Sequence, residues 1–153
     1  MIEISLHSGS REPLASLFSE ADDSESQIAS YRDLGDLLVA IEAGHVLGHA
    51  QLVETEEPGI VELKSLAVRE ERRSQGIGAA LVASAIAYCR SSEARKVQVA
   101  TAAASIDALK FYQRQGFRIQ RVIRDFYSSA RGYRPLQLNG IPLLDEVILD
   151  LDL

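Results

Sequence analysis

The feature that most constrains the fold is the order of residue types in SLAVREERRSQGIGAAL, residues 65 to 81. An apolar run is followed by a sharply charged stretch, then by two glycines one residue apart, and then by alanines and a leucine. Apolar residues that end in a charged turn are typical of a strand, and an alanine-rich run without proline favours a helix. The segment therefore predicts a buried strand that leads through a turn into a helix opening near Gly76.

The two glycines near the start of this helix predict an anion site. A helix begins with backbone N–H groups that have no acceptor inside the helix, and its dipole places partial positive charge at the same end. Gly76 and Gly78 keep side chains away from these groups, and Arg73 adds a charged donor. Close helix packing or plain turn geometry explains two glycines equally well. A nucleotide-binding P-loop is excluded, because Ala79 and Ala80 replace its lysine and its serine or threonine.

The pattern on either side of the segment predicts one mixed sheet. Three apolar stretches within residues 37–68 are separated by turn residues, which is typical of an antiparallel meander. A helix over 76–91, a short strand over 96–100 and a helix stopped by Gly116 then predict a crossover unit, and two strands close the chain. We expect a single domain over residues 1–153 of the α/β class, in its α+β form. Its mixed, mostly antiparallel sheet is flanked by helices on both faces.

Composition and charge argue against several classes of function. The chain has 153 residues and a net charge of −6, which disfavours broad electrostatic binding of nucleic acid or anionic lipid. Its single cysteine, Cys89, has no internal disulfide partner, and the first residues lack the pattern of a signal peptide. We therefore expect a cytoplasmic protein with no membrane segment. His45 and His49 lie too far apart along a strand to share an ion, so no metal site is expected.

Two motifs together resemble those of the GNAT family of N-acetyltransferases. Arg73, Gly76 and Gly78 fit the RxxGxG signature of that family, and the preceding ELKSLAV looks like its usual strand into the cofactor loop. The later stretch SIDALKFYQRQGF, residues 105–117, resembles the second motif of the family, commonly NxxAxxFYxxxGF. The two motifs are also a helix and a strand apart, as in the family. The resemblance covers roughly residues 36–124 and implies the GNAT fold, with acetyl-CoA as the acetyl donor.

The resemblance also implies how these residues bind the cofactor. The backbone of the strand end, Leu66, Ala67 and Val68, is expected to pair with the pantetheine arm as an added strand. Arg73 and the backbone amides of the turn and helix start are expected to hold the pyrophosphate: Ser74, Gln75, Gly76, Ile77, Gly78 and Ala79. Ser105 stands where the family often has asparagine, so its bond to the cofactor arm is in question. The alternative role for Ser105 is a helix N-cap.

Acetyl transfer to an amine needs a base, a polarised thioester carbonyl and an acid for the departing thiolate. Tyr112 is the candidate acid, because it lies two helical turns after Ser105 and both are expected to face one groove. A packing tyrosine is the alternative. Glu62 is the candidate base, acting through water, because it resembles the strand glutamate that serves some family members. Strand alternation places Glu62 on the same side as Lys64 and Val68, so an ion pair with Lys64 is the alternative. The N–H of Val68 is expected to polarise the carbonyl.

Two further stretches are candidates for the acceptor site. The aromatic and basic segment 124–142 is long for a connection, which is typical of a binding loop; a surface loop or a homodimer contact is the alternative. The acidic stretch from Glu20 to Glu25 has the charge to attract a cationic amine. We expect an acetyl-CoA-dependent N-acetyltransferase that moves acetyl directly to a primary amine of a small molecule or peptide. A non-catalytic module that senses acyl-CoA or mediates an interaction is the alternative.

Overall fold

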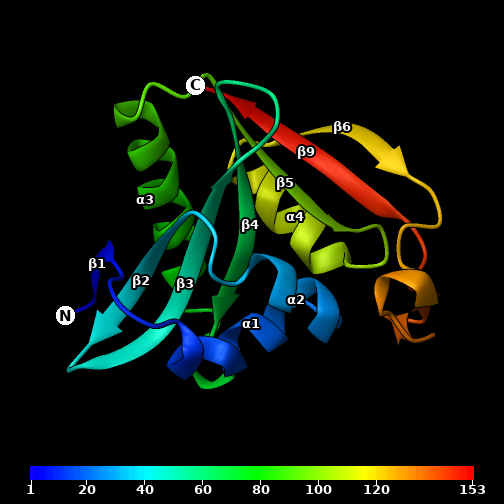
Figure 1. The fold of residues 1–153 in the computed structure, drawn as a ribbon, viewed down its shortest axis with the longest axis horizontal. Coiled ribbons are helices and arrows are strands. Elements are labelled where there is room, and N and C mark those ends of the chain that lie inside the picture. The colour runs from blue at the N-terminus through cyan, green and yellow to red at the C-terminus, as the bar shows by residue number, and fades with distance from the viewer.

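The computed structural model describes all 153 residues and contains a seven-stranded sheet and a separate two-stranded hairpin (Figure 1). The order of strands across the large sheet is β1-β2-β3-β4-β5-β9-β6. Only β4 and β5 run parallel. The strands are β1 (Glu3–Leu6), β2 (Asp36–Glu42), β3 (His45–Glu54), β4 (Ile60–Val68), β5 (Lys96–Ala102), β6 (Arg118–Ile123), β7 (Gln137–Leu138), β8 (Ile141–Pro142) and β9 (Glu146–Asp152). The mixed, mostly antiparallel sheet expected from the sequence is confirmed.

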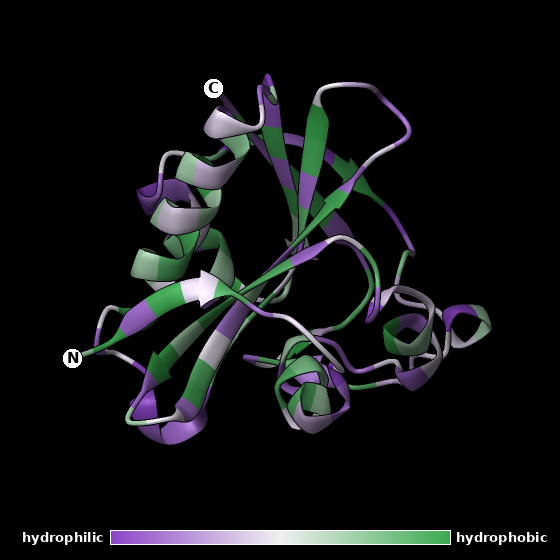
Figure 2. Cartoon of the chain, turned by 60° about the vertical axis from the view of Figure 1, so that its left-hand side comes forward, coloured by the Kyte–Doolittle hydropathy of each residue, from purple (hydrophilic) through white to green (hydrophobic).

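Helices cover both faces of this sheet. They are α1 (Ala15–Ala21), α2 (Glu25–Tyr31), α3 (Ile77–Ser91) and α4 (Ile106–Arg114), with 3-10 turns η1 (Glu12–Leu14), η2 (Glu70–Arg72) and η3 (Ser129–Arg131). Along β2, Leu38 and Ala40 join the main core under α3 and α4, whereas Leu37 and Val39 join a smaller core under α1 and α2. Figure 2 shows hydrophobic stretches on the strands and on α3, where the main core lies. None of the helices has the length and apolar character needed to cross a membrane.

Local sequence explains where several elements begin and end. Ala43 and Gly44 both have positive φ, 50° and 79°, as a two-residue turn between β2 and β3 requires. The hydroxyl of Ser24 accepts a hydrogen bond from the N–H of Gln27 and so caps α2. Gly116 adopts a φ of 101° just after α4. The turn between the first two strands of the meander and the helix stop at Gly116 are therefore confirmed.

A β-bulge in β4 changes which of its residues share a face. The register against β3 shifts between Leu63 and Ser65, which leaves Lys64 as an extra residue. Val68 packs against the main core, whereas Glu62 lines a pocket on the opposite side of the sheet, next to α2. Glu62 and Lys64 do lie on one side, but the expectation that Val68 lies there too is wrong. The extra residue reverses the alternation partway along the strand.

The strands β4 and β5 separate after a short parallel ladder. Their pairing runs only from Ile60 opposite Lys96 to Leu63 opposite Val99. The remainder of β4 pairs with β3 alone, and the two strands diverge toward the lower half of Figure 1. The crossover through α3 is what allows β4 and β5 to run parallel while their ends move apart.

This separation leaves an open strand edge. The N–H of Arg69 donates a hydrogen bond of 2.8 Å to the carbonyl of Leu47 on β3. Because backbone groups of an antiparallel strand point alternately to its two edges, those of Leu66 and Val68 point away from β3. The end of β4 therefore presents backbone groups that have no strand partner to the space between β4 and β5.

Candidate active site

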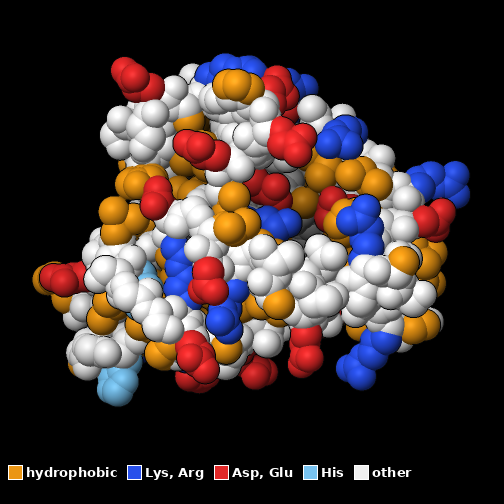
Figure 3. All heavy atoms as spheres, in the orientation of Figure 1, with side chains coloured by type: hydrophobic (Ala, Val, Ile, Leu, Met, Phe, Trp, Pro, Cys, Tyr) orange, Lys and Arg blue, Asp and Glu red, His pale blue; other side chains and the backbone are white.

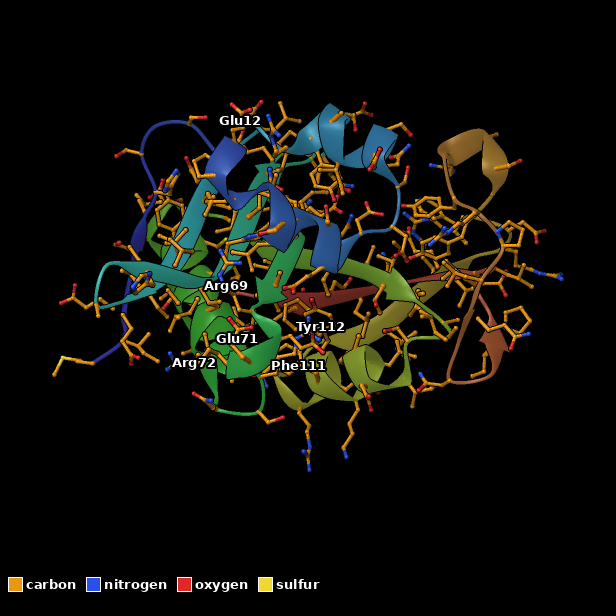
Figure 4. All side chains as sticks on the ribbon, turned by 90° about the horizontal axis from the view of Figure 1, so that it is seen from below. Glu12, Arg69, Glu71, Arg72, Phe111 and Tyr112 are labelled. Atoms are coloured by element: carbon orange, nitrogen blue, oxygen red, sulfur yellow. The ribbon has the colours of Figure 1, made fainter.

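A groove of about 800 Å³ lies where β4 separates from β5. The end of β4 and the turn after it form one wall, and α4 forms the other. Figure 4 shows Phe111 and Tyr112 on α4 opposite the segment that carries Arg69, Glu71 and Arg72. Ten residues that the sequence assigned to a cofactor line this groove: Leu66, Ala67, Val68, Arg73, Ser74, Gly76, Ile77, Gly78, Ala79 and Ser105. The fold thus brings the residues of two separate motifs to one place.

The N-terminus of α3 presents a row of free backbone N–H groups to this groove. None of the six N–H groups from Ser74 to Ala79 donates a hydrogen bond to another group of the protein, and the first bond of the helix runs from Ala80 to the carbonyl of Gly76. Gly76 has a φ of 83°, and a Cβ placed on it would meet no atom within 4 Å. The helix dipole adds partial positive charge at this end. We call residues 74–79 the amide cradle, and its geometry suits a phosphate.

Two arginines flank the amide cradle. The Nε of Arg73 donates to the carbonyl of Val68 (3.1 Å), and its Nη2 lies 3.6 Å from a carboxylate oxygen of Glu20. The Nε of Arg72 donates to the side-chain carbonyl of Gln75 (3.0 Å). The side chain of Gln75 is therefore directed at Arg72 and does not line the groove. The expected role of Gln75 concerns its backbone N–H alone, which this side-chain contact does not occupy.

Tyr112 is buried at the base of the groove, with 8% of its surface exposed. Its ring packs edge-on against Phe111 and Phe117, with centroids 5.2 Å and 5.8 Å away. Burial raises the pKa of the Tyr112 phenol well above its ordinary value, so the hydroxyl keeps its proton at neutral pH. The residue is thus both a packing tyrosine and a protonated hydroxyl that lines a groove, and the two alternatives drawn from the sequence do not exclude each other.

Ser105 occupies the N-cap position of α4, but its side chain makes no capping hydrogen bond. Ser105 therefore has the N-cap position that the alternative role predicts, but not the capping hydrogen bond. Ser105 and Tyr112 line the same groove, as their spacing predicts. Ser105 also lines a second pocket, so its hydroxyl lies where the two spaces meet.

The second pocket is acidic and has a volume of about 360 Å³. Glu20 and Ser105 line both this pocket and the groove, and a hollow of about 220 Å³ that reaches Tyr112 lies between them. Figure 3 shows a hollow near the centre of this face with acidic side chains in and around it. One cation, Lys64, and five carboxylates line what we call the acidic pocket: Glu20, Asp22, Asp23, Glu62 and Glu146.

Part of the segment 124–142 forms one wall of the acidic pocket. Phe126, Tyr127 and Tyr133 line it and contact one another, with ring centroids 4.9 Å apart for the two tyrosines. Tyr133 is buried in a small apolar cluster with Ala102 of β5, which anchors the segment to the sheet. The segment expected to be a binding loop therefore lines a pocket. Its alternative role, as a homodimer contact, stays a prediction.

Two carboxylates reach the acidic pocket from the sheet. Glu62 on β4 lies 3.7 Å from the Nζ of Lys64, so the ion pair named as its alternative role does form, and Glu62 lines the pocket as well. Glu146, the first residue of β9, is only 8% exposed, and its carboxyl forms no hydrogen bond or ion pair within the protein. Burial, followed by the charge of Glu62, raises the pKa of Glu146 to about 7. Sequence reasoning missed Glu146, whose only signal was an acid at the start of an apolar strand.

His49 and Cys89 are core residues that lie apart from the groove and the acidic pocket. His49 is fully buried and stacks on Phe18 at 4.3 Å, and its Nε2 lies 2.8 Å from the hydroxyl of Ser65. Burial lowers the pKa of His49 to about 3. Cys89 is a small buried member of the main core. No three His, Cys, Asp or Glu side chains converge in an arrangement that suits a metal ion.

Replacing Glu146 by glutamine tests how this carboxyl is held. Its pKa of about 7 lies above the ordinary value, so the folded chain keeps this proton at about pH 5 and loses it at about pH 8. Ionisation in the folded state costs stability, and this cost appears as the pH rises through about 7. Glu146→Gln should therefore unfold with a free energy higher than wild type by about 1–3 kcal/mol at about pH 8, and by much less at about pH 5.

Urea unfolding of both proteins at the two pH values measures this difference. The charged neighbours that face Glu146 are Glu62 and Lys64 of β4, Arg121 of β6 and Arg131, and they are the same in both proteins. Their titration therefore cancels in the comparison. Equal differences at both pH values would show that Glu146 has an ordinary pKa.

Comparison with known proteins agrees with this geometry. The sequence profile of the Acetyltransferase (GNAT) family matches residues 5–117. An uncharacterized N-acetyltransferase of Bacillus subtilis, YvbK, is 33% identical over 153 residues, which cover 99% of this chain and 97% of that protein. Both matches favour an enzyme over a non-catalytic module.

Two solved structures share the fold over their whole length. A Bacillus subtilis acetyltransferase in complex with CoA has a TM-score of 0.91 and 31% identity, and the match covers 100% of this chain and 99% of that one. A GNAT family acetyltransferase from Elizabethkingia anophelis with acetyl-CoA bound has a TM-score of 0.92 and 28% identity, with 99% and 98% covered. The expected fold and resemblance are confirmed, and this chain belongs to the Acetyltransferase (GNAT) family.

Proposed function

We propose that this acetyltransferase binds acetyl-CoA in the groove and moves the acetyl group directly to a primary amine held in the acidic pocket. The observation that carries the proposal is the amide cradle: six adjacent N–H groups with no acceptor in the protein, at the mouth of a groove that adjoins a pocket of opposite character. A helix start ordinarily leaves about four N–H groups without an acceptor, and here Ser74 and Gln75 extend that row beside the open approach at Gly76, so that an anion is able to accept from several of them.

The residues of the groove fit the diphosphate of a CoA thioester. The amide cradle offers N–H donors and the positive end of a helix dipole. Gly76 has a positive φ, which favours glycine, and its lack of a side chain leaves the approach open. Arg73, half exposed beside it, adds a charged donor. The chain has a net charge of −6, so an anion must be held by such local geometry. The CoA and acetyl-CoA complexes of the two similar structures support this choice of donor.

The open edge of β4 is proposed to hold the pantetheine arm. Leu66 and Val68 direct backbone groups away from β3, and an extended amide chain placed between β4 and α4 is able to pair with them. The carbonyl of Val68 already accepts from Arg73. The N–H of Val68 has no strand partner, and we assign it to the thioester carbonyl, where a fixed donor stabilises the charge that develops during transfer.

Two side chains are proposed to move protons. Glu62, which lines the acidic pocket, takes a proton from the bound ammonium through water, so that the neutral amine is free to attack. As the new C–N bond forms and the C–S bond breaks, the Tyr112 hydroxyl gives its proton to the departing sulfur, and the second proton, which the nitrogen loses as the amide forms, restores the phenol. The raised pKa of Tyr112 ensures that this proton is present at neutral pH. The hollow that borders both Tyr112 and the acidic pocket gives the acetyl group a direct path to the amine.

Replacing Gly76 tests the amide cradle. Asparagine and aspartate have the same size and tolerate a positive φ about equally, so the pair Gly76→Asn and Gly76→Asp differs mainly by one negative charge. CoA should bind the aspartate variant about tenfold or more weakly than the asparagine variant, because the added carboxylate faces the diphosphate. Calorimetric titration of both variants with CoA measures the ratio. Equal affinities would place the diphosphate elsewhere.

Replacing Tyr112 by phenylalanine tests the acid. Release of free thiol from acetyl-CoA in the presence of a panel of primary amines follows the transfer reaction. Tyr112→Phe should lower kcat roughly a hundredfold or more, while CoA affinity stays within about threefold of wild type. Tyr88→Phe is the matched control, because the Tyr88 hydroxyl bonds Asp36 and does not line the groove. A Tyr112→Phe variant with wild-type kcat across the pH range would remove Tyr112 from the acid role.

A further inference from the structure

The acidic pocket holds more negative charge than one reacting amine requires. Its single cation, Lys64, is already engaged by Glu62 (3.7 Å) and by the ring face of Tyr31 (4.9 Å). Of the other four carboxylates in the lining, Glu20 pairs with Arg73, which lies outside the pocket. The remaining three carboxylates form no ion pair: Asp22, Asp23 and Glu146. A pocket of this charge favours a ligand that carries more than one positive centre.

Glu146 is the specific observation that points to such a ligand. It is more than nine-tenths buried, lines the acidic pocket and has no hydrogen bond or ion pair with any protein group. Lys64, Arg131 and Arg121 lie within electrostatic range, but none of them forms an ion pair with Glu146, and Lys64 pairs with Glu62 instead. A buried carboxyl without a partner is unfavourable, so its retention in a pocket is explained if a ligand supplies the partner.

The position of Glu146 in the sheet separates it from Glu62. Glu62 pairs with Gln98 of β5, whereas Glu146 pairs with Ala102, on the opposite edge of the same strand. The two carboxylates therefore rise on either side of β5, whose residues 100–102 line the floor of the acidic pocket between them. The groove opens on the β4 side, so an amine near Glu62 is close to the thioester and a charge near Glu146 is not.

The walls between these two carboxylates suit an alkyl chain with charged ends. Tyr31 and Tyr133 donate hydrogen bonds to the carboxylate of Asp22 (3.0 Å and 2.7 Å), which fixes their rings. Tyr127 packs edge-on against Tyr133. Burial, followed by the charges of Glu146 and Asp22, raises the pKa of the Tyr127 phenol. Aromatic faces beside carboxylates bind methylene groups and ammonium ions together. The volume of about 360 Å³ is that of a small-molecule site.

We propose that the acceptor is a small aliphatic diamine or polyamine, whose reacting nitrogen lies at Glu62 while Glu146 binds a second ammonium group. This inference rests on the proposed function and adds the substrate class to it. Glu146 acts as a specificity residue: it pairs with a charge that takes no part in bond making. A monoamine of equal length reaches the thioester but leaves the Glu146 carboxyl without a partner.

Two acceptors that differ only in the second charge test the proposal: n-butylamine and 1,4-diaminobutane. Beyond the twofold statistical factor of two equivalent amines, kcat/KM for the diamine should exceed that of butylamine about tenfold or more in wild type. Glu146→Gln should remove this preference through KM, with a much larger loss for the diamine than for butylamine. Glu25→Gln is the matched control, because Glu25 is an exposed acid of the same region that does not line the pocket, and it should keep the preference.

Equal kcat/KM for the two amines in wild type, or a preference that survives Glu146→Gln, would overturn the diamine assignment. Turnover of a lysine peptide with neither small amine accepted would overturn it too and assign the pocket to a protein acceptor. The proposed function fails separately, by absence of thiol release with every amine and peptide. Calorimetric titration of the CoA-saturated protein with the same two amines still measures the preference in that case, so the binding ratio decides the diamine assignment on its own.

Discussion

The separation of β4 from β5 after a ladder of four residue pairs is the constraint on which the site depends. If the ladder had continued, the backbone groups of Leu66 and Val68 would be hydrogen-bonded to β5, and there would be no groove between β4 and α4. Because the strands diverge, one side of β4 stays open and the N-terminus of α3 meets that opening with the amide cradle. The crossover that makes the two strands parallel therefore also creates the space that a cofactor needs.

Charge divides the site into two halves that suit different ligands. The groove combines the N–H groups and helix dipole of the amide cradle with four cationic side chains in its lining, which suits an anion: Arg72, Arg73, Lys110 and Arg114. The acidic pocket, which meets the groove at Ser105 and Glu20, attracts cations and repels phosphate groups. Under the proposed function, a polyanionic donor and a cationic acceptor would be directed to opposite sides of the same hollow, which would orient the thioester toward the amine before any chemistry takes place.

Much of the groove was predictable because its determinants are local. The glycines at 76 and 78 and the aromatic pair at 111–112 act through residues a few positions away, so their motifs indicate the helix starts and the shared groove directly. The side assignment along β4 was wrong because a single extra residue, Lys64, reverses the alternation, and nothing in a regular apolar pattern marks a bulge. Glu146 was missed because many of the residues that share its pocket come from α2, β4 and β5, which lie far from it in the sequence.

The most direct measurement of the central claim is amide hydrogen exchange over residues 74–79, with and without acetyl-CoA. We expect these amides to exchange rapidly in the free protein, since none has an acceptor in the fold. Saturating acetyl-CoA should slow their exchange by about tenfold or more. Exposed amides elsewhere, such as those of the turn at 43–44, should exchange at the same rate with and without acetyl-CoA. Slow exchange in the free protein, or exchange that acetyl-CoA leaves unchanged, would contradict the central claim.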